Sequence, residues 1–270
     1  MTNGKSGLVR SYFVPNGSYL MELAEDGSDA AQVRALREIG SELEKEKVDA
    51  VIIASPHWLP KSAFFVDCGD IHESFHDYVL RPAAFGRRFY THTLPGAPRL
   101  AKELVAAGQA AGLPVKEKTY GLDHGAFCPL KVMGTRIPTI PISMSQRSHQ
   151  ESFEWGKVIR SAIDRSGMRV GLIAPGNLCH RLDLRDEKAG GSYFAEGKEF
   201  DRQVCEFVVA GRSRDISKID RKLWEAAAPE ADLRNLFLIA GASGEAAGHL
   251  MQYEGAIYSV GDATFAFDTV

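Results

Sequence analysis

Short apolar runs alternate with longer amphipathic segments along most of this chain of 270 residues. The run at 49–54 has the length and apolar character of a buried strand, and the segment at 29–47 places its apolar residues on one helical stripe. The C-terminal third reads as mostly helical before a final strand near 256–267. Strands that alternate with helices are typical of an α/β layer fold, and the lack of a low-complexity linker or repeat favours one domain over residues 1–270.

The composition excludes several classes of function. The formal net charge of -3 gives no overall basic character that would attract nucleic acid or anionic lipid. No apolar run approaches the roughly 20 residues that span a bilayer, and the N-terminus lacks an apolar stretch long enough for a signal peptide. The four cysteines lie far apart without a CxxC pair, which suits a reducing compartment. We therefore expect a cytoplasmic protein that binds neither nucleic acid nor membranes.

Polar side chains follow the ends of several predicted strands. Asn16, His57, His124 and His180 each lie just past such an end or soon after it. Ligands of open α/β sheets bind outside the carboxyl ends of the strands, so these side chains predict one convergent polar site. The alternative is coincidence, because histidines are common in loops.

Three segments together resemble a known enzyme family. They read SPHW at 55–58, GLDHGAFCPL at 121–130 and GNLCH at 176–180. In this order and spacing they resemble the class III extradiol ring-cleaving dioxygenases, the family of the protocatechuate 4,5-dioxygenase catalytic subunit and plant DOPA dioxygenases. With the strand–helix alternation, the resemblance predicts a central mixed sheet flanked by helices on both faces.

The resemblance also implies a chemistry. Members of this family hold non-haem Fe(II) with two histidines and one carboxylate, which leaves positions open for a catechol and O2. We therefore expect an extradiol dioxygenase, or a subunit of one, that cleaves a small catechol- or aminophenol-type ring with O2. No organic cofactor is expected, because the glycines at 240–244 lack the full GxGxxG framework of a nucleotide-binding turn.

Residues of this chain take family roles by their place in the motifs. His57 matches the second histidine ligand, and Glu245, between small residues at 242–248, matches the carboxylate ligand. His180 matches the catalytic histidine that moves substrate protons, for which an imidazole pKa near 6.5 is suited. His124 matches a supporting or substrate-contacting histidine. The alternatives are packing histidines and an ordinary solvated helix glutamate.

Asn16 departs from the family pattern. It stands where the family has its first histidine ligand, and an amide is a poorer ligand for Fe(II) than an imidazole. Two replacements are conceivable. His249 would share a helix face with Glu245 four residues earlier, or His124 could approach the metal.

Asn16 leaves two main hypotheses open. The chain is either an active extradiol enzyme with Fe(II), or a metal-free partner of a homologous catalytic subunit. The aminophenol 1,6-dioxygenases of this family combine two such similar subunits. A metal hydrolase is a third reading that no nucleophile motif supports. We expect a homo-oligomer or a complex with the homologous subunit, with 64–66 and 83–85 as apolar candidates for the interface.

Overall fold

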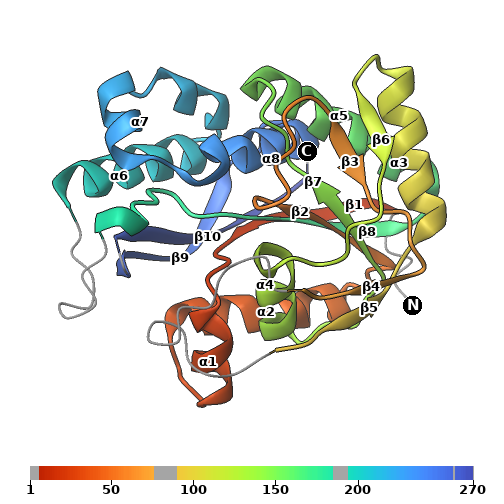
Figure 1. The fold of residues 1–270 in the computed structure, drawn as a ribbon, viewed down its shortest axis with the longest axis horizontal. Coiled ribbons are helices and arrows are strands. Elements are labelled where there is room, and N and C mark those ends of the chain that lie inside the picture. The colour runs from red at the N-terminus through yellow and green to blue at the C-terminus, as the bar shows by residue number, and fades with distance from the viewer. Residues whose placement is uncertain (1–5, 76–89, 185–193, 258, 270) are drawn as a thin grey trace.

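The computed structural model describes residues 6–75, 90–184, 194–257 and 259–269, and its centre is an eight-stranded sheet (Figure 1). The strand order is β6-β3-β7-β2-β8-β1-β10-β9. The strands are β1 (Gly7–Val14), β2 (Ala50–Ser55), β3 (Phe64–Val66), β6 (Val115–Glu117), β7 (Thr139–Ser143), β8 (Arg169–Pro175), β9 (Gly248–Ile257) and β10 (Val260–Phe267). A separate pair is formed by β4 (Ile71–Glu73) and β5 (Thr93–Pro95).

The sheet is mixed, as the sequence predicts. Strands β7, β2, β8 and β1 are parallel neighbours, whereas β10 and β9 add to β1 in antiparallel order. The parallel strands are mostly apolar and buried, because both of their faces are covered. Their carboxyl ends therefore meet at one edge.

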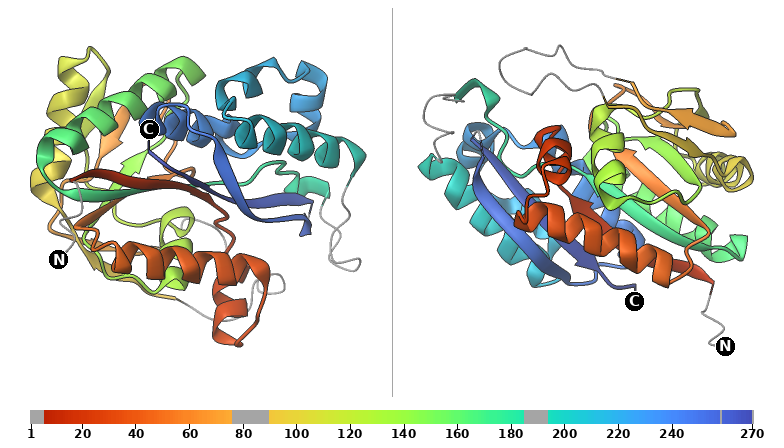
Figure 2. Two further views of the ribbon diagram at one scale, coloured as in Figure 1. Left: turned by 180° about the vertical axis from the view of Figure 1, so that it is seen from behind. Right: turned by 90° about the horizontal axis from the view of Figure 1, so that it is seen from below.

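Helices cover both faces of the sheet (Figures 1 and 2). One face carries α1 (Tyr19–Glu25), α2 (Ala31–Lys45) and α4 (His124–Met133). The other carries α3 (Pro98–Ala110), α5 (His149–Ser166), α6 (Ala195–Val209), α7 (Arg221–Ala227) and α8 (Arg234–Ser243), with α7 outside α6. Short 3-10 turns are η1 (Leu182–Leu184), η2 (Ser213–Lys218) and η3 (Glu230–Leu233). The prediction of an α/β domain with a mixed sheet between two helical layers is confirmed.

The C-terminal region differs from its prediction. Instead of one final strand, β9 and β10 form an antiparallel pair at the edge of the sheet, and β9 begins at Gly248 in a segment that was expected to be helical. No helix among the described residues is long and apolar enough to cross a membrane.

Of the two apolar stretches expected at an interface, the structure describes only the one at 64–66. Residues 64–66 form β3, where Phe64 and Val66 are buried and Phe65 stacks on Trp58 with a centroid distance of 6.0 Å. Residues 83–85 lie outside the described residues.

Two buried aspartates lie beside the C-terminal strands. Asp201 on α6 accepts hydrogen bonds from the backbone nitrogen of Cys179 (2.8 Å) and the hydroxyl of Tyr253 (2.9 Å). Asp262 on β10 accepts one from the hydroxyl of Tyr19. Burial raises the pKa of Asp262 to about 8 and that of Asp201 to about 7, because the charged carboxylate loses its water. Both groups are therefore acids that stay protonated well above their ordinary range.

The raised pKa of Asp262 predicts a loss of stability as the pH rises. Between about pH 4 and pH 8 the folded chain keeps a proton that the unfolded chain has released, so the free energy of unfolding falls across this window. Asp262→Asn keeps an acceptor for Tyr19 and removes this dependence. Urea denaturation measures the free energy of unfolding of both proteins. Relative to the parent, the value for the variant should rise by a few kcal/mol, the order of magnitude to which the pKa shift corresponds, between pH 4 and pH 8. Asp70→Asn, at an exposed position, is the control, and equal pH slopes in parent and Asp262→Asn would contradict the prediction.

Candidate functional site

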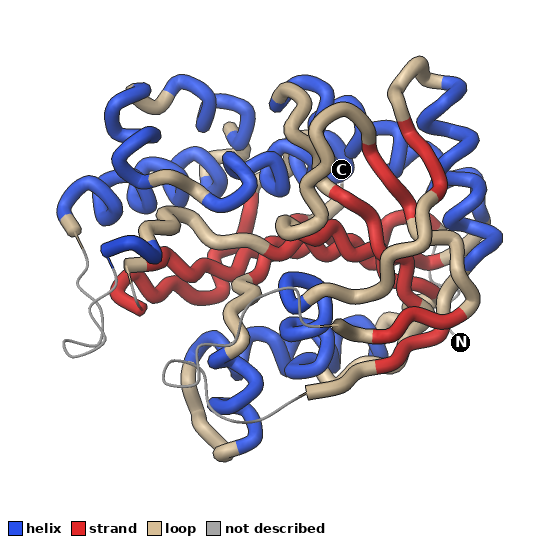
Figure 3. Tube along the Cα trace, viewed as in Figure 1, coloured by secondary structure: helices blue, strands red, loops and turns tan. Residues whose placement is uncertain are grey.

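Three polar side chains lie together because three parallel strands end side by side. Asn16, His57 and Asn177 each follow the last residue of β1, β2 and β8 by two positions. These strands are neighbours in the order β2-β8-β1, and loops border their carboxyl ends (Figure 3). The prediction that strand ends bring Asn16 and His57 into one polar site is therefore confirmed.

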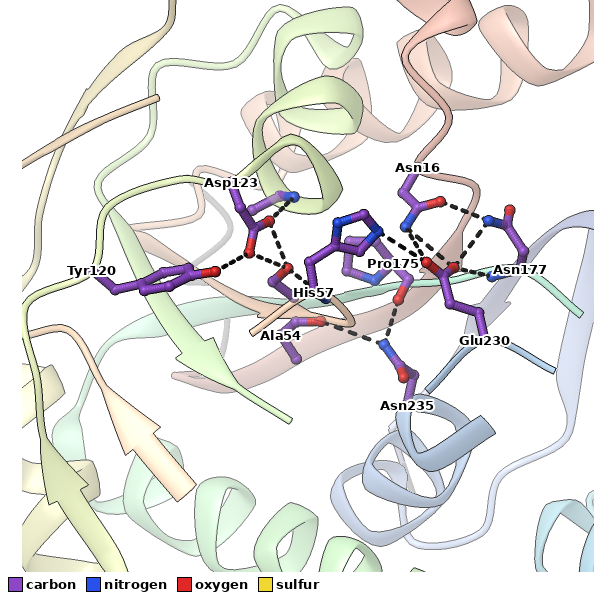
Figure 4. A network of polar contacts seen from close by, with 11 residues as sticks. Asn16, Ala54, His57, Tyr120, Asp123, Pro175, Asn177, Glu230 and Asn235 are labelled. Carbon is purple, nitrogen blue, oxygen red and sulfur yellow. Dashed lines mark hydrogen bonds and ion pairs between the residues drawn. The ribbon is translucent and has the colours of Figure 1, made fainter. Parts of the chain in front are cut away.

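A carboxylate from elsewhere in the chain lies among these side chains. It belongs to Glu230, the first residue of η3, which is only 8% exposed (Figure 4). His57 Nε2 lies 3.1 Å from Glu230 Oε1, and Asn16 Nδ2 lies 3.2 Å from both carboxylate oxygens. Asn177 donates to Oε2 from its backbone nitrogen and from Nδ2, both at 2.9 Å. Glu230 is thus the centre of the site.

The orientation of the Asn16 amide follows from its neighbours. Asn177 Nδ2 donates to Asn16 Oδ1 at 2.8 Å, so Asn16 Nδ2 faces Glu230. A reversed amide would place Oδ1 against the carboxylate, and two acceptors there would repel each other. Asn16 therefore presents a donor to the centre of the site where a metal would need a lone pair.

The charge of Glu230 is maintained by its surroundings. Burial alone would raise the pKa of Glu230, but the positive charges of His180 and His57, with hydrogen bonds from His57 and Asn16, hold it at about 2. The carboxylate is therefore ionised, and its two oxygens are fully engaged by these donors.

His124 joins the site as the first residue of α4. Its ring lies edge-on to that of His57, with a centroid distance of 3.9 Å. Asp123 caps α4 by accepting from the backbone nitrogen of Ala126 at 3.0 Å, and it accepts from Ser55 Oγ at 2.6 Å. Asp123 thereby ties the end of β2 to the start of α4, which fixes His57 and His124 against each other.

Gly125 permits a close approach at this junction. A Cβ atom there would lie 3.1 Å from Ser55 Oγ and 3.2 Å from His57 Cδ2, closer than most such contacts. The glycine of the motif at 121–130 thus lets the first turn of α4 approach the end of β2.

His180 reaches the site from the segment after β8. Its backbone nitrogen donates to the carbonyl of Ala227 at 2.9 Å, and it forms an isolated bridge with Val260. Its charge is the largest single attraction that lowers the pKa of Glu230. The structure therefore brings His180 together with Asn16, His57 and His124, as the sequence predicts.

Glu245 does not join these residues, and the prediction that it converges with them is wrong. It lies beyond the end of α8 with its side chain 43% exposed and its carboxylate 3.9 Å from Arg214. The small residues just before it, on α8, have another role, because α8 packs closely on α5 at Gly241. A Cβ atom at Gly241 would overlap the carbonyl oxygen of Phe153, and one at Gly156 would overlap that of Leu238.

The replacement ligand at His249 is excluded by the same geometry. It was expected to share a helix face with Glu245, but α8 ends at Ser243 and His249 lies exposed on β9. Glu230 and Asn177 were not predicted as site residues from the sequence. Asn177 stood in the motif at 176–180, whereas Glu230 had no motif and only its place after Pro229, beyond a short helix, to mark it.

The segment that carries Glu230 has an unusual backbone. Ala228, Ala231, Asp232 and Leu233 have φ values of 45°, 47°, 58° and 51°. The left-handed conformation costs a residue with a side chain about 1–2 kcal/mol, so this turn needs support from outside itself.

The donor set does not fit a metal held by two histidines and a carboxylate. His57 Nε2 and Glu230 Oε1 are adjacent, but the third position is occupied by the amide nitrogen of Asn16. Over the described parts of the chain, no three His, Cys, Asp or Glu side chains are grouped so that they could hold a metal ion. His124 and His180 do not complete a set with this pair.

Comparison with known proteins identifies the family. Residues 13–267 match the family described as the catalytic LigB subunit of aromatic ring-opening dioxygenase. The chain is 29% identical to the 3,4-dihydroxyphenylacetate 2,3-dioxygenase of Escherichia coli over 219 residues, which are 76% of this chain and 77% of that enzyme. It is 23% identical to the 4,5-DOPA dioxygenase extradiol of Beta vulgaris over 246 residues, 89% of each protein.

The fold is also shared with a solved structure. The crystal structure of an uncharacterized protein from Escherichia coli K12 superposes with a TM-score of 0.72 and 18% identity, covering 96% of this chain and 99% of that one. At this identity the likeness concerns the fold alone. The family match over nearly the whole chain and the strand-end histidines lead to one conclusion: the chain belongs to the LigB family of class III extradiol, aromatic ring-opening dioxygenases.

Proposed function

We propose that this chain is the partner subunit of an extradiol dioxygenase complex and that a homologous subunit carries the catalytic iron. The complex would cleave a catechol- or aminophenol-type ring with O2. The observation that carries the proposal is the Asn16 amide nitrogen, 3.2 Å from both oxygens of Glu230. It stabilises the ionised carboxylate by hydrogen bonds, and His57 is the imidazole for which the described part of the chain shows a hydrogen bond to Glu230.

In this proposal the retained histidines stabilise the charged Glu230 carboxylate and do not act on a substrate. A buried carboxylate without compensation would be costly, and the interactions with His57 and His180 lower the pKa of Glu230 so that it stays ionised. His124 packs against His57 and limits its movement. We place the complex in the cytoplasm on the basis of the cysteine spacing.

A second candidate is that the chain is itself a catalytic, iron-dependent subunit. The 3.1 Å approach of His57 Nε2 to Glu230 Oε1 favours it, because two ligands of one metal lie at such a separation. His180 and His124 would then serve as the groups that hold and move substrate protons. The metal content of the purified chain separates the two candidates.

Iron retention tests the proposal directly. The chain alone, purified without oxygen in the presence of Fe(II), should retain far less than one iron per chain, because the amide cannot replace an imidazole donor. Asn16→His should raise the occupancy by about tenfold or more, the scale on which changes around a metal site act. Elemental analysis by mass spectrometry measures both.

A double variant provides the control for this gain. Asn16→His with Glu230→Gln keeps the added imidazole and removes the anionic ligand, so its iron content should return to the level of the unmodified chain. Near-stoichiometric iron in the unmodified chain would contradict the partner-subunit proposal and favour the catalytic one.

Association with a second subunit is also testable. The chain should sediment as an oligomer, and co-expression with a homologous LigB-type catalytic subunit should yield a mixed complex. Ring-opening activity with a catechol or aminophenol substrate should require that second subunit. A monomer at high concentration that recovers no such partner would contradict the prediction.

A further inference from the structure

The geometry points to Asp232 as a positioning residue for Glu230. Its carboxylate holds the left-handed turn of η3 in the conformation that directs the Glu230 side chain into the site. The inference deepens the proposed function, and its significance rests on that function, because a subunit without a metal needs another means to keep the site in shape.

The turn cannot be explained by its own sequence preferences. Ala231, Asp232 and Leu233 follow one another in the left-handed region, which glycine adopts freely and alanine or leucine adopts rarely. No glycine occurs between Ala228 and Leu233. Such a conformation persists only where surrounding contacts over-determine it.

Asp232 supplies contacts to three helices. Its Oδ1 accepts from Trp224 Nε1 on α7 at 2.7 Å, and its Oδ2 lies 2.9 Å from His149 Nε2 at the start of α5. Arg234, the first residue of α8, pairs with Oδ2 at 3.1 Å. One carboxylate therefore joins α5, α7 and α8 at the turn.

The same partners also hold the backbone of the turn. His149 Nε2 lies 2.9 Å from the carbonyl oxygen of Asp232, and Arg234 donates to the carbonyls of Ala231 (3.1 Å) and Arg147 (2.7 Å). The His149 ring is itself fixed, because it stacks on Phe237 with a centroid distance of 4.2 Å and an interplanar angle of 3°. The side chain and two carbonyls of the turn are thus restrained together.

If the turn relaxed, Glu230 would change position, whereas α8 would stay in place. Asn235 at the start of α8 donates to the carbonyls of Ala54 and Pro175, at the ends of β2 and β8, and this anchors the helix independently. Glu230 lies between that anchor and α7. A turn that returned to right-handed φ values would therefore displace the Glu230 carboxylate from its hydrogen bonds with Asn177.

The backbone amide of Asn177 reports on this displacement, because it donates to Glu230 Oε2 at 2.9 Å. In Asp232→Ala, prepared metal-free with a chelator, hydrogen exchange at this amide should accelerate by about tenfold or more, and its proton resonance should move upfield. Exchange at Leu172, within β8, should stay unchanged. Trp224→Phe removes only one contact of Asp232 and should give a smaller change in the same direction.

Asp183→Ala is the matched control, since Asp183 also pairs with an arginine (Arg181, 2.7 Å) but is exposed and makes no contact with the turn. It should leave the Asn177 amide unchanged. The inference is overturned if Asn177 and Leu172 accelerate in the same proportion in Asp232→Ala, because Asp232 would then support only global stability. It is also overturned if neither amide responds in Asp232→Ala and Trp224→Phe. The measurement needs no metal, so its outcome is separate from the iron content that tests the proposed function.

Discussion

The compensation of one buried negative charge governs the site. The Glu230 carboxylate lies at the junction of β1, β2 and β8, where little water reaches it, and an ionised carboxylate is stable there only if every oxygen is paired. The amides of Asn16 and Asn177 and the imidazole of His57 supply that pairing. Because Asn177 fixes the direction of the Asn16 amide, the residue that departs from the family pattern is integrated into the site.

Much of the fold and part of the site could be predicted from the sequence, because local regularities encode them. Parallel strands end at one edge, so polar residues after strand ends identified Asn16 and His57 without any coordinates. The motif at 121–130 identified His124, and the structure supplies the reason, since Asp123 and Gly125 fit α4 against the end of β2.

The remainder depended on contacts that no local pattern reveals. Small residues near Glu245 suggested a crowded pocket, whereas Glu245 lies exposed beyond α8 and the nearby Gly241 permits close packing of α8 on α5. Glu230 lies at the start of a turn whose left-handed backbone conformation is one that its residues rarely adopt. The hydrogen-bond partners of Glu230 lie 53 to 214 positions away in sequence. The segment that was predicted to be helical forms β9 instead, because its pairing with β10 at the sheet edge outweighs its local helix propensity.

The close approach of α5 and α8 at Gly156 and Gly241 also has a mechanical consequence. Two helices whose backbones approach this closely cannot slide past each other without steric overlap, so α5 and α8 move as one rigid unit. Helix α5 begins at His149 and α8 begins at Arg234, and both residues contact the turn that carries Glu230. A displacement of one helix would therefore move the other with it, and both helices meet the turn beside Glu230 at their first residues.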